Sequence, residues 1–68
     1  MRGKRIAQLR KGMGWTQKEL SEVTGLSRGY IAAIEAGKDP GIRALAVIAE
    51  ALGIKVSELY EAVRQITP

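Results

Sequence analysis

Apolar residues recur every three or four positions along most of this chain, which is the spacing of an amphipathic helix. The first run predicts a helix over about residues 2–11, with Ile6 and Leu9 on one face and Met13 continuing the same spacing. Gly12 follows, and glycine readily adopts the left-handed conformation that ends a helix. The pattern therefore predicts a short first helix.

The second helix has the strongest start signal in the chain. Thr16 is a good N-cap residue, and Glu19 three positions later completes the sequence of a capping box. Trp15 and Leu20 have the spacing of a hydrophobic staple around that cap. A helix from Thr16 to about Val23 has only about two turns, so it needs packing against other helices to be stable.

A third helix is predicted after a short turn. Ser27 is its expected N-cap, its end is expected near Ala36, and Gly37 occupies the position after that end. Ile31 and Ile34 mark the face that points into the protein.

The start of the fourth helix has two interpretations. Asp39 caps it with Pro40 as the first helical residue, or Gly41 caps a slightly later start. Gly53 is expected to end this helix. Its apolar positions are Ile42, Leu45, Ile48, Ala49 and Leu52.

A fifth helix is predicted over residues 56–66, with Leu59, Tyr60 and Val63 at helical spacing. Its start is poorly capped, because Lys55 stands where a capping residue would help. Alternating runs and hairpin dipeptides, the signals of strands, are absent from the sequence. The predicted fold class is all-α, with about five short helices in one domain over residues 1–68.

The composition excludes several kinds of chemistry. The chain has 68 residues with no Cys and no His, so disulfides, the usual zinc or haem ligands and Ser–His or Cys–His nucleophile pairs are excluded. The sequence also has no glycine-rich phosphate loop and no clustered carboxylate pair. We therefore expect no enzyme, no catalytic residues, no metal and no cofactor. No apolar run has the length of a membrane span or a signal core, which favours a cytoplasmic protein.

Charge is distributed unevenly along the chain. Residues 1–18 carry six bases and no acid, whereas residues 19–68 carry five bases and seven acids. A basic end on a nearly neutral body favours a polyanionic partner such as nucleic acid. The alternative is a solvated helix face, and charge alone leaves the two open.

The second and third helices have the layout of a DNA-binding helix-turn-helix over residues 16–36. Ser21 is small where the two helices must approach, and Gly25 opens the turn between them. The apolar contacts expected to fix the angle between the helices come from Leu20, Val23, Leu26, Ile31 and Ile34.

Three motifs resemble the Cro and phage-repressor type of helix-turn-helix, also called the XRE family, over about residues 6–60. They are Thr16-Gln17-x-x-Leu20, Ile31-x-x-Ile34-Glu35-x-Gly37 and Ile48-Ala49-x-x-Leu52-Gly53. The resemblance implies a compact five-helix repressor-like domain. Family members are mostly small prokaryotic or phage transcription regulators that bind operators as homodimers, with the third helix in the major groove. The resemblance also implies that Arg10 and Glu35 form a structural pair between the first and third helices.

Helical geometry points few large side chains outward from the third helix. With Ile31 and Ile34 inward, an advance of about 100° per residue places Ala36 among the outward positions. The base-reading candidates are Ser27, Arg28, Gly29, Ala32 and Ala33. Only Arg28 among them is a strong candidate for a bidentate contact to guanine, with Ser27 supporting it. We therefore expect DNA shape and deformability to carry more of the specificity than usual.

Phosphate contacts are expected mainly from basic residues, some of which are simply solvated. The candidates are Arg10, Lys11, Lys18, Tyr30, Lys38 and Arg43, with Arg5 on the basic end as a further one. The family resemblance implies a further phosphate contact from Gln17, at the start of the second helix. An ordinary first-turn position is the alternative for Gln17, and packing against a neighbour is the alternative for Tyr30.

The last two helices, over about residues 41–66, are expected to complete the core and supply the dimer interface. The interface candidates are Val56, Leu59, Tyr60, Val63 and Ile66. The alternative is that Val56, Leu59 and Val63 only close the core of the monomer.

The sequence thus predicts a sequence-specific DNA-binding transcription regulator, in particular a repressor, acting on double-stranded DNA as a homodimer. A phage repressor, a restriction–modification controller and an antitoxin with a toxin partner all fit. The alternative function is a protein-interaction adaptor with weak or nonspecific DNA binding, which the small residues Gly29, Ala32, Ala33 and Ala36 motivate.

Overall fold

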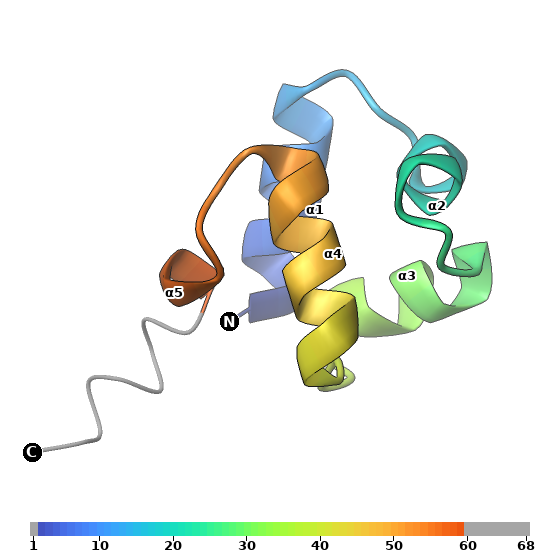
Figure 1. The fold of residues 1–68 in the computed structure, drawn as a ribbon. Coiled ribbons are helices and arrows are strands. Elements are labelled where there is room, and N and C mark those ends of the chain that lie inside the picture. The colour runs from blue at the N-terminus through green and yellow to red at the C-terminus, as the bar shows by residue number, and fades with distance from the viewer. Residues whose placement is uncertain (1, 60–68) are drawn as a thin grey trace, which may run out of the picture.

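The structure, a computed structural model, describes residues 2–59 and confirms the all-α fold class over that range (Figure 1). The described part contains five helices and no strand. They are α1 (Arg2–Gly12), α2 (Gln17–Thr24), α3 (Arg28–Glu35), α4 (Ile42–Leu52) and α5 (Val56–Leu59).

The predicted caps of α2 and α3 are confirmed. The Glu19 backbone N–H donates to the Thr16 hydroxyl at 3.1 Å, and the Thr16 N–H donates to the Glu19 carboxylate at 2.8 Å, which completes the capping box. The Ser27 hydroxyl accepts from the Tyr30 N–H at 3.1 Å. Gly25 lies at φ 78°, so it provides the left-handed turn between the two helices.

The structure decides between the two starts considered for α4. Gly41 is the N-cap residue, with extended backbone and no side-chain cap, and the helix ends at Leu52 before Gly53. The start of α5 is better capped than the sequence suggested. The Glu58 carboxylate accepts a 3.0 Å hydrogen bond from the Lys55 N–H, as the acid of a capping box does. The predicted continuation of this helix to residue 66 lies outside the described residues.

The core lies between α1 and α4, with α2 and α3 at one end and α5 at the other. Its fully buried side chains come from the first four helices and are Ile6, Leu20, Ile31, Ile34, Leu45 and Ile48. Leu59 brings α5 into the same cluster, and the half-buried side chains of Leu9, Trp15 and Leu26 pack against it.

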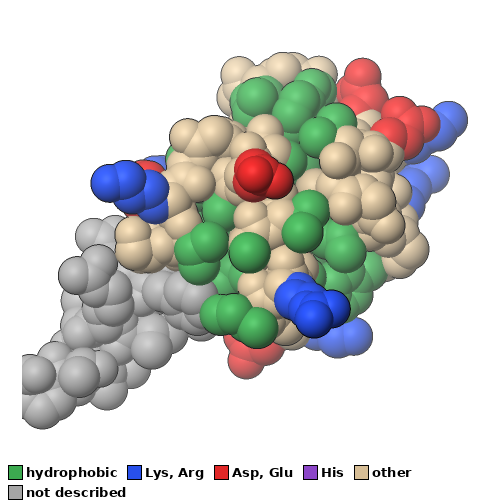
Figure 2. All heavy atoms as spheres, in the orientation of Figure 1, with side chains coloured by type: hydrophobic (Ala, Val, Ile, Leu, Met, Phe, Trp, Pro, Cys, Tyr) green, Lys and Arg blue, Asp and Glu red, His purple; other side chains and the backbone are tan. Residues whose placement is uncertain are grey.

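Three apolar positions lie outside this core, contrary to the helical spacing. Met13 is 47% exposed because α1 has already ended at Gly12, and Val23, expected to contact α3, is 55% exposed. Ile42, the first residue of α4, is 66% exposed. Figure 2 shows hydrophobic side chains gathered on the surface over α4.

The contact between α1 and α3 depends on a glycine. Gly3 is buried in the first turn of α1, and a Cβ atom there would overlap with the backbone carbonyl oxygen of Ile34 near the end of α3. A backbone atom cannot move aside as the end of a side chain can. The absence of a side chain at this position therefore sets how closely α1 approaches the end of α3.

We expect Gly3→Ala to destabilise the fold by about 1–3 kcal/mol, because α1 must move away from Ile34. Gly12→Ala is the matched control, since an added Cβ there meets nothing within 4 Å. Urea unfolding followed by circular dichroism measures both variants. Equal stability of the Gly3 variant and the wild type would contradict this packing.

Candidate nucleic-acid interface

A buried ion pair connects the end of α3 to α1. The Arg10 guanidinium donates from Nε to Glu35 Oε2 at 2.7 Å and from Nη2 to Glu35 Oε1 at 3.0 Å. Its third hydrogen bond goes from Nη1 to the Trp15 backbone carbonyl at 2.7 Å. Arg10 is only 7% exposed. The pair that the family resemblance implied is therefore present, in the bidentate geometry that suits guanidinium and carboxylate.

The same carboxylate also holds the start of α2. The Gln17 side-chain amide donates to Glu35 Oε1 at 3.0 Å. Glu35 therefore binds groups from both α1 and α2, and the three residues fix the end of α3 against both helices. The spacing of the sequence did not reveal this contact for Gln17. Its role at a phosphate stays a prediction.

Arg10 is wrong as a phosphate candidate. Its guanidinium is buried and makes three hydrogen bonds inside the protein, so reaching a phosphate would require breaking the pair with Glu35. The position of Arg10 in the basic N-terminal segment suggested an exposed side chain. Its partner Glu35 lies 25 residues away along the chain, so the charge pattern of that segment could not reveal the pair. Arg10 therefore contributes to the interface indirectly, by holding the end of α3 through Glu35.

The ion pair shifts the titration of both residues. Burial raises the pKa of Glu35, but the hydrogen bonds from Arg10 and Gln17 and the charges of Arg10 and Lys11 lower this pKa more, so it lies below its ordinary value. The hydrogen bond to Glu35 likewise raises the pKa of Arg10, against a smaller opposing effect of burial. Both groups are therefore charged at neutral pH.

The turn between α2 and α3 is closed by side-chain hydrogen bonds. The Ser21 hydroxyl donates to the Leu26 carbonyl at 2.5 Å. The Thr24 hydroxyl donates to the Leu20 carbonyl at 2.7 Å and accepts from the Leu26 N–H at 3.2 Å. Ser21 was expected here only for its small size, and the role of Thr24 was not predicted. These bonds fix α3 relative to α2.

The surface of α3 has little side-chain bulk. Arg28 and Gly29 are exposed at its start, whereas Ala32 and Ala33 are half-buried farther along. The Ser27 hydroxyl oxygen caps the helix by accepting from the Tyr30 N–H. Arg28 is therefore the largest exposed polar side chain among the five base-reading candidates.

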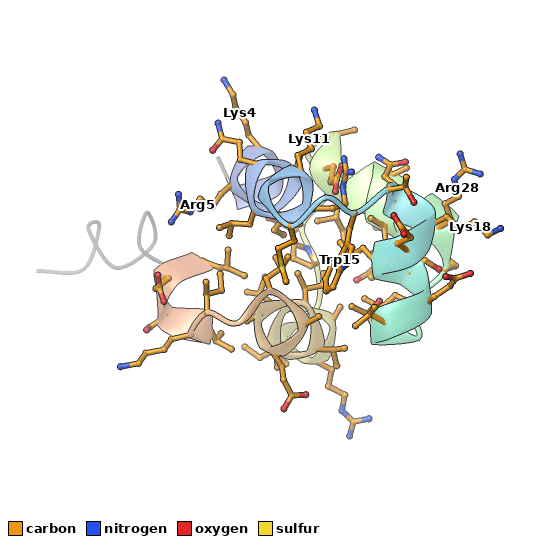
Figure 3. The ribbon with its side chains drawn as sticks, turned by 90° about the horizontal axis from the view of Figure 1, so that it is seen from above. Lys4, Arg5, Lys11, Trp15, Lys18 and Arg28 are labelled. Atoms are coloured by element: carbon orange, nitrogen blue, oxygen red, sulfur yellow. The ribbon has the colours of Figure 1, made fainter. Side chains whose placement is uncertain are left out.

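Two exposed cations lie at one end of the molecule. Lys18 extends from α2 and Arg28 from α3, both at the end of the molecule away from α5 (Figure 3). Lys4 and Lys11 extend from the outer side of α1, and Arg5 points toward the α5 end (Figure 3). The cations of α2 and α3 thus extend from one end of the molecule, whereas those of α1 extend in other directions (Figure 3).

The connection between α3 and α4 is attached to α3 by Tyr30. The Tyr30 hydroxyl accepts a 3.2 Å hydrogen bond from the Gly41 N–H, and the Lys38 Nζ lies 5.2 Å from the centre of the Tyr30 ring. Tyr30 therefore packs against its neighbours, as one of its two interpretations held, while the hydroxyl can still donate. Lys38 and Arg43 are both exposed.

Leu59 is wrong as a dimer-interface candidate. It is 4% exposed and belongs to the core of the monomer, where it attaches α5 to the other helices. Val56 is half-buried against the same core. The remaining candidates, Tyr60, Val63 and Ile66, lie outside the described residues.

The described residues show neither a metal site nor a membrane helix. No group of three or more acidic, His or Cys side chains within residues 2–59 is placed to hold a metal ion. No helix in the same range is both long and apolar enough to cross a membrane.

The sequence model of the family described as Helix-turn-helix matches residues 6–59, from the first core residue of α1 to the end of α5. The chain belongs to the helix-turn-helix family. Its match includes the Arg10–Glu35 pair, the turn at Gly25 and the start of α3. The fold expected from the family resemblance is therefore correct over the described part of the chain.

Relatives of this helix-turn-helix protein include regulators from phages and bacteria. It is 43% identical over 58 residues to the immunity repressor protein of Bacillus phage phi105, and the match covers 84% of this chain and 40% of the repressor's length. The crystal structure of SinR, a master regulator for biofilm formation, in complex with DNA superposes with a TM-score of 0.82 at 34% identity, covering 87% of this chain and 97% of that chain. SinR comes from Bacillus subtilis.

A second SinR structure contains a protein partner. The chain from the complex of SinR protein and SinI protein has a TM-score of 0.85 at 30% identity, covering 100% of this chain and 68% of that chain. Structural neighbours of this fold have therefore been solved both with DNA and with another protein.

We expect Glu35→Gln to destabilise the fold by about 3 kcal/mol at neutral pH, because the variant leaves Arg10 buried without a counter-charge. The lowered pKa of Glu35 means that its charge stabilises the folded state above the ordinary carboxyl range. This contribution is lost as the pH falls through the folded-state pKa. The difference in stability between wild type and variant should therefore shrink in acid.

Urea unfolding at a series of pH values measures this difference. Glu22→Gln is the matched control, because Glu22 is exposed on α2. A difference between the wild type and Glu35→Gln that stays constant from neutral pH into acid would show that the charge of Glu35 does not stabilise the fold.

Proposed function

We propose that this helix-turn-helix protein is a transcription repressor that binds operator DNA as a homodimer, with α3 in the major groove. The observation that carries the proposal is the position of Arg28. It is exposed at the start of a helix that Glu35 fixes from the other end, and it extends from the same end of the molecule as the exposed Lys18 (Figure 3). The relation to a phage immunity repressor and the likeness to DNA-bound SinR support it.

Arg28 reads sequence in this proposal, and the neighbouring residues position the helix. A guanidinium at the start of a recognition helix can bind guanine O6 and N7 together. Gly29 and the alanine methyl groups permit close approach to the groove, where methyl groups of Ala32 and Ala33 contact thymine methyls. Because few side chains of α3 reach base edges, operator shape supplies the rest of the specificity.

Phosphate contacts set the affinity and the orientation on the duplex. The residues proposed for them are Lys11, Gln17, Lys18, Tyr30 and Lys38. Arg43 belongs with them by charge, but it stands on the outward face of α4. These residues serve binding and not catalysis. We therefore propose that the protein is not an enzyme and that it acts in the cytoplasm.

A second candidate function is binding to a regulatory protein. The complex of SinR with SinI favours it, since SinR has the same fold and takes a protein partner. The small side chains on α3 favour it as well. In that case the chain would bind DNA weakly and without sequence preference.

Enrichment of random duplex DNA by the purified protein separates the two functions. A motif with two half-sites about 34 Å apart supports operator binding by a dimer. Recovery of DNA with no enriched motif contradicts the proposed function and favours the protein-binding alternative.

We expect Arg28→Ala to weaken binding to the best operator by about 1–3 kcal/mol and to relax one base position. Arg28→Lys keeps the charge but loses the planar fork, so it should also lose base preference. Fluorescence anisotropy with the best operator and its single-base variants measures both. If Arg28→Lys keeps full affinity and preference, Arg28 contacts only phosphate.

Binding should also depend steeply on salt. Six to ten phosphate contacts in a dimer imply a loss of ~10³–10⁵ in affinity between 50 and 200 mM salt. Lys18→Ala should reduce the slope of log K against log salt by about one per protomer. Lys55→Ala, before α5, is the control and should leave the slope unchanged. An unchanged slope for Lys18→Ala would remove Lys18 from the interface.

A further inference from the structure

The outward face of α4 combines apolar and charged side chains that face solvent. Arg43, Ala46, Val47 and Glu50 are all exposed, and their spacing of three, four and seven residues places them on one face. The opposite face holds the buried side chains of this helix. No hydrogen bond or ion pair to another residue of the range 2–59 engages the side chain of Arg43 or Glu50. Figure 2 shows hydrophobic side chains over α4 with charges of both signs among them.

The order of these four residues is self-complementary. Arg43 and Glu50 stand at equal distances along the helix from a point between Ala46 and Val47. A second copy of the helix that runs antiparallel through this point brings each Arg43 opposite Glu50 of the other copy. Arg43 and Glu50 are about 10 Å apart along the helix axis at 1.5 Å per residue. Because this separation is the same in both copies, the two ion pairs form at the same time. Ala46 at the centre allows the backbones to approach closely.

We propose that this face, the α4 face of Arg43, Ala46, Val47 and Glu50, pairs with the same face of a second copy of the chain around a two-fold axis. Charge complementarity selects this partner, because an isologous interface must match itself. A helix running in the same direction would place Arg43 beside Arg43. The antiparallel arrangement also aligns the helix dipoles favourably.

The pairing leaves the proposed DNA-binding end uncovered. In Figure 3, α4 lies on the side opposite α1, whereas Lys18 and Arg28 extend from the end formed by α2 and α3. The inference deepens the homodimer of the proposed function by naming its surface and replaces the interface predicted at Leu59. It assigns Arg43 to self-association instead of phosphate binding. The tests below use no DNA, so their failure leaves operator binding unaffected.

A contact through one helix face buries less surface than stable interfaces do, which bury about 1,200 Å² or more in total. The dimer should therefore be weak. We expect sedimentation equilibrium of the wild type to show a monomer–dimer equilibrium at high micromolar concentration. Arg43→Glu and Glu50→Arg should each raise the dissociation constant about tenfold or more, because each places like charges opposite each other twice.

A mixture of the two single variants gives the decisive result. A dimer of R43E with itself sets two acids opposite each other at both sites, and a dimer of E50R with itself sets two bases there. A dimer of one R43E chain with one E50R chain restores opposite charges at both sites. The equimolar mixture should therefore associate about as strongly as the wild type, and so should the doubly substituted R43E/E50R chain.

Two variants with the same charge changes elsewhere are the controls. Arg5→Glu on α1 and Glu22→Arg on α2 both alter exposed residues outside the α4 face. Both should associate as the wild type does, because neither residue lies at the proposed two-fold axis. This comparison separates the local effect of Arg43 and Glu50 from the effect of net charge.

Oxidative cross-linking provides a second test that does not depend on charge. The chain has no Cys, so Ala46→Cys places a single thiol beside the proposed two-fold axis. It should form a disulfide-linked dimer faster than Ser57→Cys, whose exposed position on α5 lies away from this face. The proposal is overturned if the wild type stays monomeric at high micromolar concentration, if both single variants dimerise normally, or if the mixture shows no recovery.

Discussion

The placement of α3 depends on one buried carboxylate. Glu35 accepts hydrogen bonds from Nε and Nη2 of Arg10 and from the side-chain amide of Gln17, so α1, α2 and α3 meet at a single side chain. The Glu35 carboxylate would be costly to bury without the Arg10 guanidinium, and an apolar side chain in place of Glu35 would leave three N–H donors of Arg10 and Gln17 unsatisfied. The Arg10–Glu35 pair therefore holds the surface of α3 at a fixed position relative to α2.

Much of the fold was predictable because its signals are local. The Thr16–Glu19 capping box, the glycine turn and the spacing of Ile31 and Ile34 depend on residues within a few positions of each other, and each was confirmed. The Arg10–Glu35 pair came from the family resemblance, since no local rule connects residues 25 apart. The errors arose where tertiary packing decides. Helical spacing alone could not show that Val23 faces solvent while Leu59 is buried.

The candidate site was predicted less completely than the fold. Its exposed members, such as Arg28 and Lys18, follow from charge and helix position. The hydrogen bonds of Gln17 and Thr24 were missed, because their partners are a side chain on another helix and backbone groups. For Tyr30, packing against a neighbour was one of two interpretations, and its hydrogen bond with Gly41 supports that one. The acid that caps α5 was also missed, although Glu58 stands three positions after Lys55 as Glu19 does after Thr16. In that case the signal was present in the sequence.

The bond from Arg10 to the Trp15 carbonyl has a practical consequence. Trp15 is the only tryptophan of the chain, and its half-buried ring packs against the core. The indole is therefore an intrinsic optical probe at the junction of α1 and α2, within one hydrogen bond of the ion pair. Its emission wavelength responds to solvent entering that junction, and no dye or label is needed to observe whether the junction is intact in a given buffer or complex.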